Sequence, residues 1–363
     1  YNKTSTDYEG SAGPKSDQVN EFLEESISLS KDVLDDEVFR IWNHNNELDN
    51  LSSRYLFCLE DGSQTGGYGK DSNKEFIIYS VFDRVLNAGA FSLNNEMNYI
   101  YPTRKFIDMF VCTNGMPTTN NEQFKGYQNV TDEYQNRDYR LMAYVGGPAE
   151  SIGSTSGYGD QKFRNPIVGD KKESANYPVL RLAEVCLNYA EAIMERYGEI
   201  TDAQLGISIN KLRDRAGVVK MVVADINDSF DPNRGKYYPK GNESGILVDP
   251  VLWEIRRERI IELMGEGFGI YDIRRWRMAP WFLNRPATGL WMSKEEAMKN
   301  NMTLYNPETG YSDGTDGSLT EGNLYLFNDA LKEGKGWLDK YYLYQVPTTE
   351  ILLNPELEQN PGW

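Results

Sequence analysis

The sequence predicts a mostly α-helical protein with small β elements. Several stretches place apolar side chains three and four residues apart, the spacing that forms one face of an amphipathic helix. Runs of β-branched and aromatic residues with strand character are short, as in residues 75–82. Segments rich in glycine, asparagine and tyrosine separate these patterns and favour loops.

The first predicted helix covers residues 16–36. Its apolar face is formed by Val19, Phe22, Leu23, Ile27 and Leu34. A second helical stretch is indicated over residues 48–59, and a Gly/Ser/Asp loop follows over residues 61–73. Residues 75–82 form an apolar run that predicts a buried strand.

Residues 84–175 contain few long periodic stretches and many glycine, asparagine, tyrosine and proline residues. Within them, residues 106–111 predict a short helix and residues 146–159 a flexible loop. Loops held on a rigid frame often carry function, so this segment is a candidate for the ligand-binding face.

The clearest helix begins at Pro178, because proline suits the first turn, and ends before Gly198, a natural C-cap. Either Thr201 or Asp202 caps the next amphipathic helix, which covers residues 202–216. Two such helices joined by a short turn make a helical hairpin, the unit of tetratricopeptide (TPR) repeats. The sequence shows no set of three tandem copies, so a full solenoid is not predicted.

A further helix is predicted to start at Asp249-Pro250 and to run to about Met264, where closely spaced glycines interrupt the pattern. A helical pattern resumes over residues 271–278.

The C-terminal part predicts less regular structure. Residues 305–323 read as a loop, and residues 341–346 as a short aromatic strand. From Pro347 onward an extended tail is expected. Its predicted anchors on the body of the protein are Leu352, Leu357 and Trp363.

Composition excludes several classes of function. The net charge of −17 argues against duplex nucleic acid as a partner, because phosphate binding needs clustered Lys and Arg. No apolar run approaches the ~18 residues of a membrane-spanning helix. His44 is the only histidine, which excludes HExxH zinc sites and two-histidine mechanisms. The widely spaced Cys58, Cys112 and Cys186 are not a disulfide framework, and Cys186 is expected to be buried.

No catalytic or metal-binding motif stands out. A glycosidase needs two carboxyl groups ~5–10 Å apart, and no such pair is singled out. Residues 225–231 imitate the start of an EF-hand loop, but Phe230 replaces the required glycine and Lys236 the closing glutamate. Residues 313–317 form another acidic turn. One structural Ca²⁺ in either loop therefore remains an alternative to a solvated turn, and no other cofactor is expected.

Aromatic residues in loops are the candidate ligand-binding residues. Sugars present flat C–H faces ringed by hydroxyls, which suit an aromatic ring flanked by Asn, Asp, Gln and Arg. Several aromatic residues lie in polar, glycine-bearing segments where no helical or strand pattern assigns them to a core. The predicted ligand-binding residues are Tyr127, Tyr134, Tyr144, Tyr158, Trp281 and Trp291.

Three parts of the chain together resemble the SusD/RagB family. The first is YPVLRLAEVCLNYAEA at 177–192 with INKLRDRAG at 209–217. The second lies within 252–276, with LWEIRRER and YDIRRW. The third lies within 344–363, with YQVP, EILLNP and the closing QNPGW. The order and spacing of these motifs make the resemblance specific.

The resemblance implies a SusD-like fold, in which TPR-type helix pairs support a loop-rich ligand-binding face. Family members are lipoproteins on the cell surface of Bacteroidetes, where they capture glycans for import through a SusC-like TonB-dependent transporter in the outer membrane. The expected partners are therefore a glycan and such a transporter, with membrane contact only through a lipid anchor and no catalysis. RagB-like peptide binding, a glycoside hydrolase and a TPR-like protein-binding scaffold remain the alternatives.

The resemblance also sets expectations about domain organisation. Residues 1–60 resemble the end of the family's N-terminal helical region, and residues 61–363 its C-terminal region, which together form one compact unit. The family's N-terminal third, with the lipidated cysteine, is expected to be absent from this chain. After Gly267 the family usually continues with His or Lys and then Arg, whereas Phe268 and Gly269 follow here.

Overall fold

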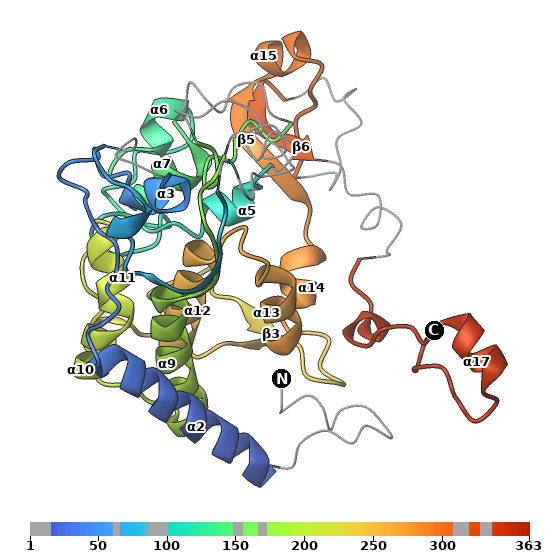
Figure 1. Ribbon diagram of the computed structural model, residues 1–363. Coiled ribbons are helices and arrows are strands. Elements are labelled where there is room, and N and C mark those ends of the chain that lie inside the picture. The colour runs from blue at the N-terminus through green and yellow to red at the C-terminus, as the bar shows by residue number, and fades with distance from the viewer. Residues whose placement is uncertain are drawn as a thin grey trace.

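The structure is a computed structural model of the chain. It describes residues 16–60, 66–83, 85, 101–147, 155–165, 173–307, 319–326 and 336–363. Helices predominate in these residues, and each sheet has only two strands. The prediction of a mostly α-helical fold with small β elements is confirmed (Figure 1).

The bounds of the elements are as follows. The helices are α2 (Ser16–Asp35), α3 (Ser52–Tyr55), α5 (Arg104–Ile107), α6 (Val130–Glu133), α7 (Tyr139–Val145), α9 (Leu182–Tyr197), α10 (Asp202–Ile207), α11 (Ile209–Arg215), α12 (Pro250–Glu262), α13 (Gly269–Arg275), α14 (Ala279–Leu283), α15 (Lys294–Lys299) and α17 (Thr348–Leu353). The antiparallel strand pairs are β1 (Phe76–Ser80) with β2 (Tyr177–Arg181), β3 (Lys236–Tyr237) with β4 (Ile246–Leu247), and β5 (Ala287–Ser293) with β6 (Glu321–Leu326).

A helical layer forms one side of the molecule. In it, α9 packs against α2, α11 and α12, and α10 leads directly into α11 (Figure 1). Their apolar faces meet in a buried cluster. Members of this cluster include Leu34, Leu182, Cys186, Ile193, Leu205, Leu212 and Ile255. Burying such side chains contributes about 1.5–3 kcal/mol each, which is the main reason these short amphipathic segments hold as helices.

The helix ends in this layer follow the sequence signals. Gly198 ends α9 with a positive φ of 75°, which only glycine adopts without strain. The side chain of Thr201 accepts a hydrogen bond from the backbone of Gln204, and the Gln204 side chain bonds back to Thr201, so Thr201 is the cap of α10. The side chain of Asp249 caps α12 by accepting hydrogen bonds from the backbone N–H groups of Val251 and Leu252.

The first sheet corrects two expectations. Pro178 does not open a helix, because residues 177–181 form β2 and pair with β1, and the helix begins only at Leu182. The strand β1 is not buried as predicted, since Ile78 is 55% exposed and Tyr79 44% exposed. A sheet of only two strands cannot cover both of its faces, so an apolar strand sequence ends half in solvent.

The loop-rich layer lies above the helical layer in Figure 1 and contains α3, α5, α6 and α7. The stretch at 48–59 forms only α3 and a 3₁₀ turn, and α5 starts two residues before the predicted short helix at 106–111. A second buried cluster lies beneath these loops and includes Phe110, Tyr144, Tyr158, Trp253 and Leu290. The loops therefore rest on a core that also includes α12.

The two layers are joined by buried ion pairs around the C-terminal end of α12, which we call the charge cluster. Its basic members are Lys162, Arg140, Arg181, Arg213 and Arg215, and its acidic members are Glu75, Asp138, Glu258, Glu262 and Glu266. The carboxylate of Glu262 accepts hydrogen bonds from two of these arginines, Arg140 at 2.9 Å and Arg181 at 2.7 Å. The cluster ties α7, β2, α11 and α12 together.

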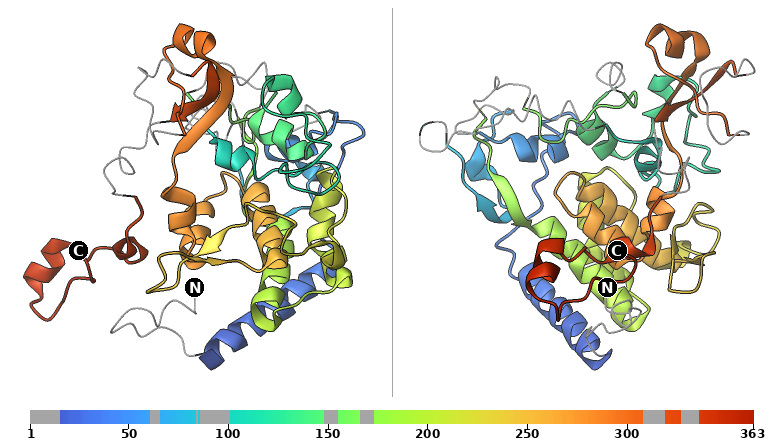
Figure 2. Two further views of the ribbon diagram at one scale, coloured as in Figure 1. Left: turned by 180° about the vertical axis from the view of Figure 1, so that it is seen from behind. Right: turned by 90° about the vertical axis from the view of Figure 1, so that its right-hand side faces the viewer.

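The C-terminal arm, residues 336–363, differs from its prediction. Residues 341–346 form no strand, and a short helix, α17, replaces part of the extended tail. The arm stands away from the helical layer in Figure 1 and in the left view of Figure 2, and Leu352 is 77% exposed. Trp363 contacts the arm itself, since its Nε1 donates to the Lys340 carbonyl at 3.0 Å. The predicted anchoring on the body is therefore wrong for Leu352, and Trp363 is anchored within the arm, while the anchoring of Leu357 stays a prediction.

The segment 305–323 was predicted to be a loop, but its last three residues belong to strand β6, which begins at Glu321. The acidic turn at 313–317 lies outside the described residues. Among the helices of the described residues, none combines the length and apolarity needed to cross a membrane.

Candidate ligand-binding site

Two of the predicted aromatic residues line one pocket, which we call the polar pocket. Its volume is about 250 Å³, and Tyr127 and Trp281 both contribute to its wall. The other lining residues are Lys105, Asp108, Met109, Pro117, Thr118, Thr119, Asp231, Asn233, Trp253, Arg257 and Arg285. Aromatic rings beside a mixture of hydroxyl, amide and charged groups form the kind of surface that a sugar needs.

Tyr127 is held at this pocket by its neighbours. Its hydroxyl donates to Asp108 Oδ1 at 3.0 Å, and the guanidinium of Arg104 lies over its ring, 4.3 Å from the centroid. Phe124 meets the ring edge-on at 4.8 Å. Burial, together with the charge of Asp108, raises the pKa of Tyr127 to about 12, so the hydroxyl stays protonated and keeps its donor.

Trp281 belongs to α14 and also lines the polar pocket. Its ring meets Trp253 edge-on at 5.3 Å, and the guanidinium of Arg285 stacks on it at 3.9 Å from the ring centroid. Arg285 is further fixed because its Nε donates to the Trp281 carbonyl at 2.8 Å. The tryptophan is therefore oriented by α12 and by its own C-terminal turn.

The floor of the polar pocket is organised by Asp231. Its carboxylate accepts from Trp253 Nε1 at 2.7 Å, from the backbone N–H of Asn233 at 2.8 Å and from Arg257. The Asn233 amide in turn donates to Thr119 Oγ1 at 2.9 Å. Three segments distant in the sequence are thus locked together around the pocket.

Charge at the polar pocket is perturbed by burial. Burial, assisted by nearby Arg285, lowers the pKa of Lys105 to about 8, while burial raises the pKa of Asp108. Lys105 Nζ donates to the carbonyls of Phe282 at 3.0 Å and Arg285 at 2.6 Å. Since an ammonium has three donors, one remains for a ligand. Perturbed groups gathered in one pocket are typical of functional sites.

The other predicted aromatic residues do not line this pocket. Tyr144 and Tyr158 are completely buried, with 0% exposure, so their rings offer no face to a sugar and the ligand-binding prediction for them is wrong. The hydroxyl of Tyr158 donates to Glu133 at 2.8 Å, and Lys162 lies over the Tyr144 ring at 4.3 Å. Both belong to the core beneath the loops, which periodicity could not reveal because the segments around them are irregular.

Tyr134 and Trp291 are half-buried and lie elsewhere. Tyr134 follows α6 and packs against the core under the loops. Trp291 belongs to β5, opposite Asn323 of β6, in an antiparallel strand pair that the sequence pattern did not reveal. Neither contributes to the polar pocket, and both remain untested as ligand contacts.

Sequence reasoning missed most of the polar side chains of the pocket. Trp253 looks like a core residue in a helical pattern, and its ring is indeed buried while also lining the pocket. Arg257 looks like a member of a helical salt-bridge ladder, and it does pair with Glu254 at 3.0 Å. Of the polar lining residues, the sequence pattern drew attention only to Asp231, as part of the segment 225–231 that resembles a calcium-binding loop.

In the segment 225–231, which resembles a calcium-binding loop, the carboxylates of Asp228 and Asp231 bind other side chains. Asp231 binds Arg257 and Trp253, and Asp228 pairs with Arg234 at 3.1 Å, so these carboxylates do not converge. Across the parts of the chain that the structure describes, no group of three His, Cys, Asp or Glu side chains is placed to hold a metal ion. The described part of the structure thus gives the calcium alternative no support.

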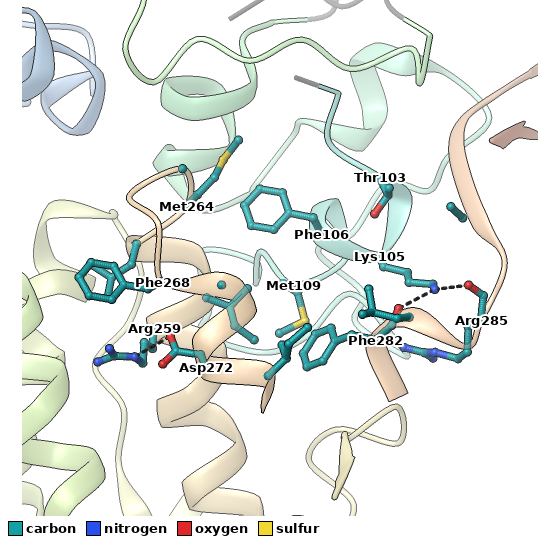
Figure 3. A pocket seen from close by; sticks show the side chains of 17 residues that line it. Thr103, Lys105, Phe106, Met109, Arg259, Met264, Phe268, Asp272, Phe282 and Arg285 are labelled. Carbon is teal, nitrogen blue, oxygen red and sulfur yellow. Dashed lines mark hydrogen bonds and ion pairs between the residues drawn. The ribbon is translucent and has the colours of Figure 1, made fainter. Parts of the chain in front are cut away.

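A second pocket, the apolar pocket, adjoins the first. It has a volume of about 410 Å³ and shares Lys105, Met109 and Arg285 with the polar pocket (Figure 3). Its remaining lining comes from the residues before and in α5, the end of α12, α13, α14 and the start of β5. The apolar side chains among them are Phe106, Ile260, Leu263, Met264, Phe268, Ile273, Phe282, Leu283 and Ala287.

A third cavity, of about 600 Å³, lies between the end of α2 and the helices α9, α10 and α11. Its charged lining residues are Glu37, Arg40, Lys211, Asp214 and Lys220. Phe39 is its only aromatic lining residue among those described, so the larger volume does not make it the better sugar site.

Known structures share this fold. The protein BT4246, in its selenomethionine form, matches with a TM-score of 0.64 and 17% identity over 95% of this chain and 65% of its own. The SusD-like carbohydrate binding protein BF0978 from Bacteroides fragilis NCTC 9343 matches with a TM-score of 0.61 and 19% identity, over 94% and 62%. The SusD-like protein BF3747 from the same organism matches with a TM-score of 0.58 and 20% identity, over 95% of this chain and 62% of its own.

The chain therefore spans between 62% and 65% of the length of these structures. None of the curated proteins matches the sequence. The sequence model of the SusD family matches residues 147–363, which is more than half of the chain and includes Trp281, Asp231 and Asn233. The shared fold agrees with that match, and the protein belongs to the SusD family.

Proposed function

We propose that the protein captures a glycan without turning it over, and that the polar pocket is its sugar site. The observation that carries this proposal is that Tyr127 and Trp281, from distant segments, line one pocket with Lys105, Asp108 and Asn233. Membership of the SusD family supports the same ligand class, and so does the fold shared with a SusD-like carbohydrate binding protein.

Each kind of lining residue has a role in this proposal. The ring of Trp281 covers the apolar face of one sugar, and Tyr127 forms the opposite wall. Lys105 offers its remaining N–H to a sugar oxygen, and Asn233 offers the part of its amide not bonded to Thr119. Because these groups are already fixed by protein contacts, binding requires little ordering of side chains.

The carboxylates of the polar pocket support binding rather than hydrolysis. A glycosidase needs a protonated carboxylic acid that can reach the leaving oxygen. Asp231 accepts hydrogen bonds from Arg257 and Trp253, and Asp108 accepts one from the Tyr127 hydroxyl, so protein donors already engage both carboxylates. A reducing-end assay with purified protein and a glycan panel tests this point, since any sustained release would contradict the non-catalytic proposal.

The larger setting is proposed from family membership. SusD family members generally act at the outer-membrane surface as lipoproteins, and we propose that this protein hands its glycan to a SusC-like TonB-dependent transporter. We also propose that residues 1–60 end an N-terminal helical region, which is supported by the packing of α2 along α9. Co-purification with a SusC-like transporter from the same cells tests the partnership, and absence of a complex would contradict it.

The sugar site is tested by replacing its rings. Trp281→Ala and Tyr127→Ala should each weaken glycan retention in affinity gels by about 10- to 100-fold, since each removes an aromatic face that contributes about 1.5–3 kcal/mol. Tyr344→Ala is the matched control, because Tyr344 is an exposed tyrosine on the C-terminal arm. Retention of each variant is measured with the glycan that the unaltered protein retains from a panel of host and plant polysaccharides.

Thermal melting is measured in parallel, because Trp281 also touches Trp253 and Phe282. If Trp281→Ala keeps full retention while still folded, the sugar site lies elsewhere. If the unaltered protein retains no glycan at all and instead binds peptides, the RagB-like alternative replaces the proposal.

A further inference from the structure

The apolar pocket lies directly beside the proposed sugar site, and two of its polar side chains, Arg259 and Asp272, are already bonded within the protein. Arg259 Nε donates to Asp272 Oδ2 at 2.8 Å, and Arg259 Nη1 donates to Asn188 at 2.8 Å. Lys105 lies at the shared edge, bonded to the carbonyls of Phe282 and Arg285 (Figure 3). A group entering this pocket therefore meets apolar walls and needs no hydrogen-bonding capacity of its own.

We infer that the ligand is a glycan carrying an apolar substituent, an acyl or aryl group, which occupies the apolar pocket while the sugar occupies the polar pocket. This inference rests on the proposed function and names its substrate class. It follows from the adjacency of the two pockets, since Lys105, Met109 and Arg285 belong to both walls.

The size and shape of the apolar pocket fit this occupant. Its volume of about 410 Å³ lies in the range of small-molecule pockets, which is roughly 300–1,000 Å³. Phe106, Phe268 and Phe282 supply rings, and Met109 and Met264 supply flexible side chains that adapt to irregular shapes (Figure 3). An aromatic or alkyl group gains contact with all of these walls.

The shared edge suits the linkage between the two parts of such a ligand. An ester or glycosidic bond brings oxygen atoms between the sugar and its substituent. Lys105 has a remaining N–H at this edge, and the guanidinium of Arg285 lies there on the Trp281 ring. Both are donors, and oxygen atoms accept from them.

Binding of alkyl glycosides tests the inference with defined probes. Isothermal titration compares methyl and hexyl β-D-glycosides of glucose, galactose and mannose on the full chain. Each methylene that leaves water adds about fourfold in affinity, so at least one hexyl glycoside should bind ~10-fold or more tightly than its methyl counterpart. A hexyl glycoside that binds where the methyl glycoside gives no signal also meets this expectation.

Two variants that fill the apolar pocket locate the effect. Gly269→Leu adds a side chain at a lining position where a Cβ meets no atom within 4 Å, and Leu283→Trp enlarges a partly exposed lining residue. Both should reduce the hexyl-to-methyl ratio to about 1 without weakening a methyl glycoside. Leu353→Trp, on the exposed face of α17, is the matched control and should keep the ratio.

The outcomes separate this inference from the proposed function. A hexyl-to-methyl ratio near 1 in the unaltered protein overturns the inference, and so does a raised ratio that survives both filling variants. Failure of the proposed function appears separately, as absence of retention for every glycan in the gels while the folded protein still melts cooperatively.

Discussion

Helix α12 contributes to two groups of charged side chains that differ in how completely their charges are matched. Glu258 and Glu262 belong to the charge cluster, where both are buried and each faces basic partners. On the other side, Arg257 lines the polar pocket beside Lys105 and Arg285. Among the residues that the structure describes, Lys105 and Arg285 form no ion pair.

The difference separates a structural role from a binding role. A buried ion pair whose partners are all present is tolerated, and removing one partner leaves a costly uncompensated charge. Burial raises the pKa of Glu262, but the nearby charges of Arg215, Arg181 and Arg140 outweigh this effect. They hold the pKa well below its ordinary range, so this carboxylate stays charged. In the polar pocket, burial lowers the pKa of Lys105 because the ammonium loses hydration. A ligand oxygen that accepts a hydrogen bond from Lys105 would stabilise the charged form again.

The largest effect is expected from Glu262→Gln, which keeps the shape of the side chain and removes its charge. Arg140, Arg181 and Arg215 then face one another without that carboxylate, so the free energy of unfolding should fall by about 3–5 kcal/mol. Urea denaturation measures the change, and the exposed Glu199→Gln serves as control with a change under about 0.5 kcal/mol. A shift as small as that of the control would mean that the cluster is not needed for stability.

Next comes Tyr158→Phe, which distinguishes a buried tyrosine from a pocket tyrosine. It removes the hydroxyl that Tyr158 donates to Glu133, so stability should fall by about 1–3 kcal/mol while glycan retention is unchanged. Tyr127→Phe, which removes the bond to Asp108, should instead weaken retention more than it lowers the melting temperature. The opposite pattern would place the sugar contact at Tyr158 and refute the assignment of the pocket.

A smaller effect is expected from pH, through Lys105. Its pKa is lowered to about 8, so its third N–H is lost as pH rises from 7 to 9, and affinity should fall about 2- to 10-fold over that range. Tyr127, with a pKa of about 12, does not titrate in this window. Lys105→Met should abolish the dependence, and calorimetric titrations at several pH values measure it. A pH profile that persists in this variant would assign the effect to a titratable group other than Lys105.

The smallest effect is expected from Leu352→Asp on α17. The side chain is 77% exposed, so stability and glycan retention should both stay within about 0.5 kcal/mol of the unaltered protein. Denaturation and affinity gels check this together. A clear loss of stability would show that the arm is covered by another part of the protein in solution.

Periodicity predicted the helical layer well. The spacing of apolar residues and the capping signals at Thr201, Gly198 and Asp249 act within a few residues, so they are legible in the sequence. The prediction was wrong at Pro178, because a residue favoured in a helix start is equally allowed in an extended strand when a partner strand is present. The partner, β1, is distant in sequence and left no local signal.

The candidate site was predictable only in part. A rule that favours aromatic residues in polar loops selected Tyr127 and Trp281 but also Tyr144 and Tyr158, which are buried. Tyr158 is buried because Glu133 and Arg104 satisfy its hydroxyl and ring from other segments. No residue close to Tyr158 in the sequence indicates that Glu133 and Arg104 will lie next to it.

By itself the sequence determined the main helices of the helical layer, the caps at Gly198, Thr201 and Asp249, the absence of a histidine-based or zinc-based catalytic motif, and the resemblance to the SusD/RagB family. These features depend on local spacing and on residue identity, which the chain carries without folding. Only the tertiary structure decided that Tyr127, Trp281 and Asn233 meet, that the charges around Glu262 are matched, and that an apolar pocket adjoins the polar one. The physical reason is that burial and long-range pairing arise from segments far apart in the chain.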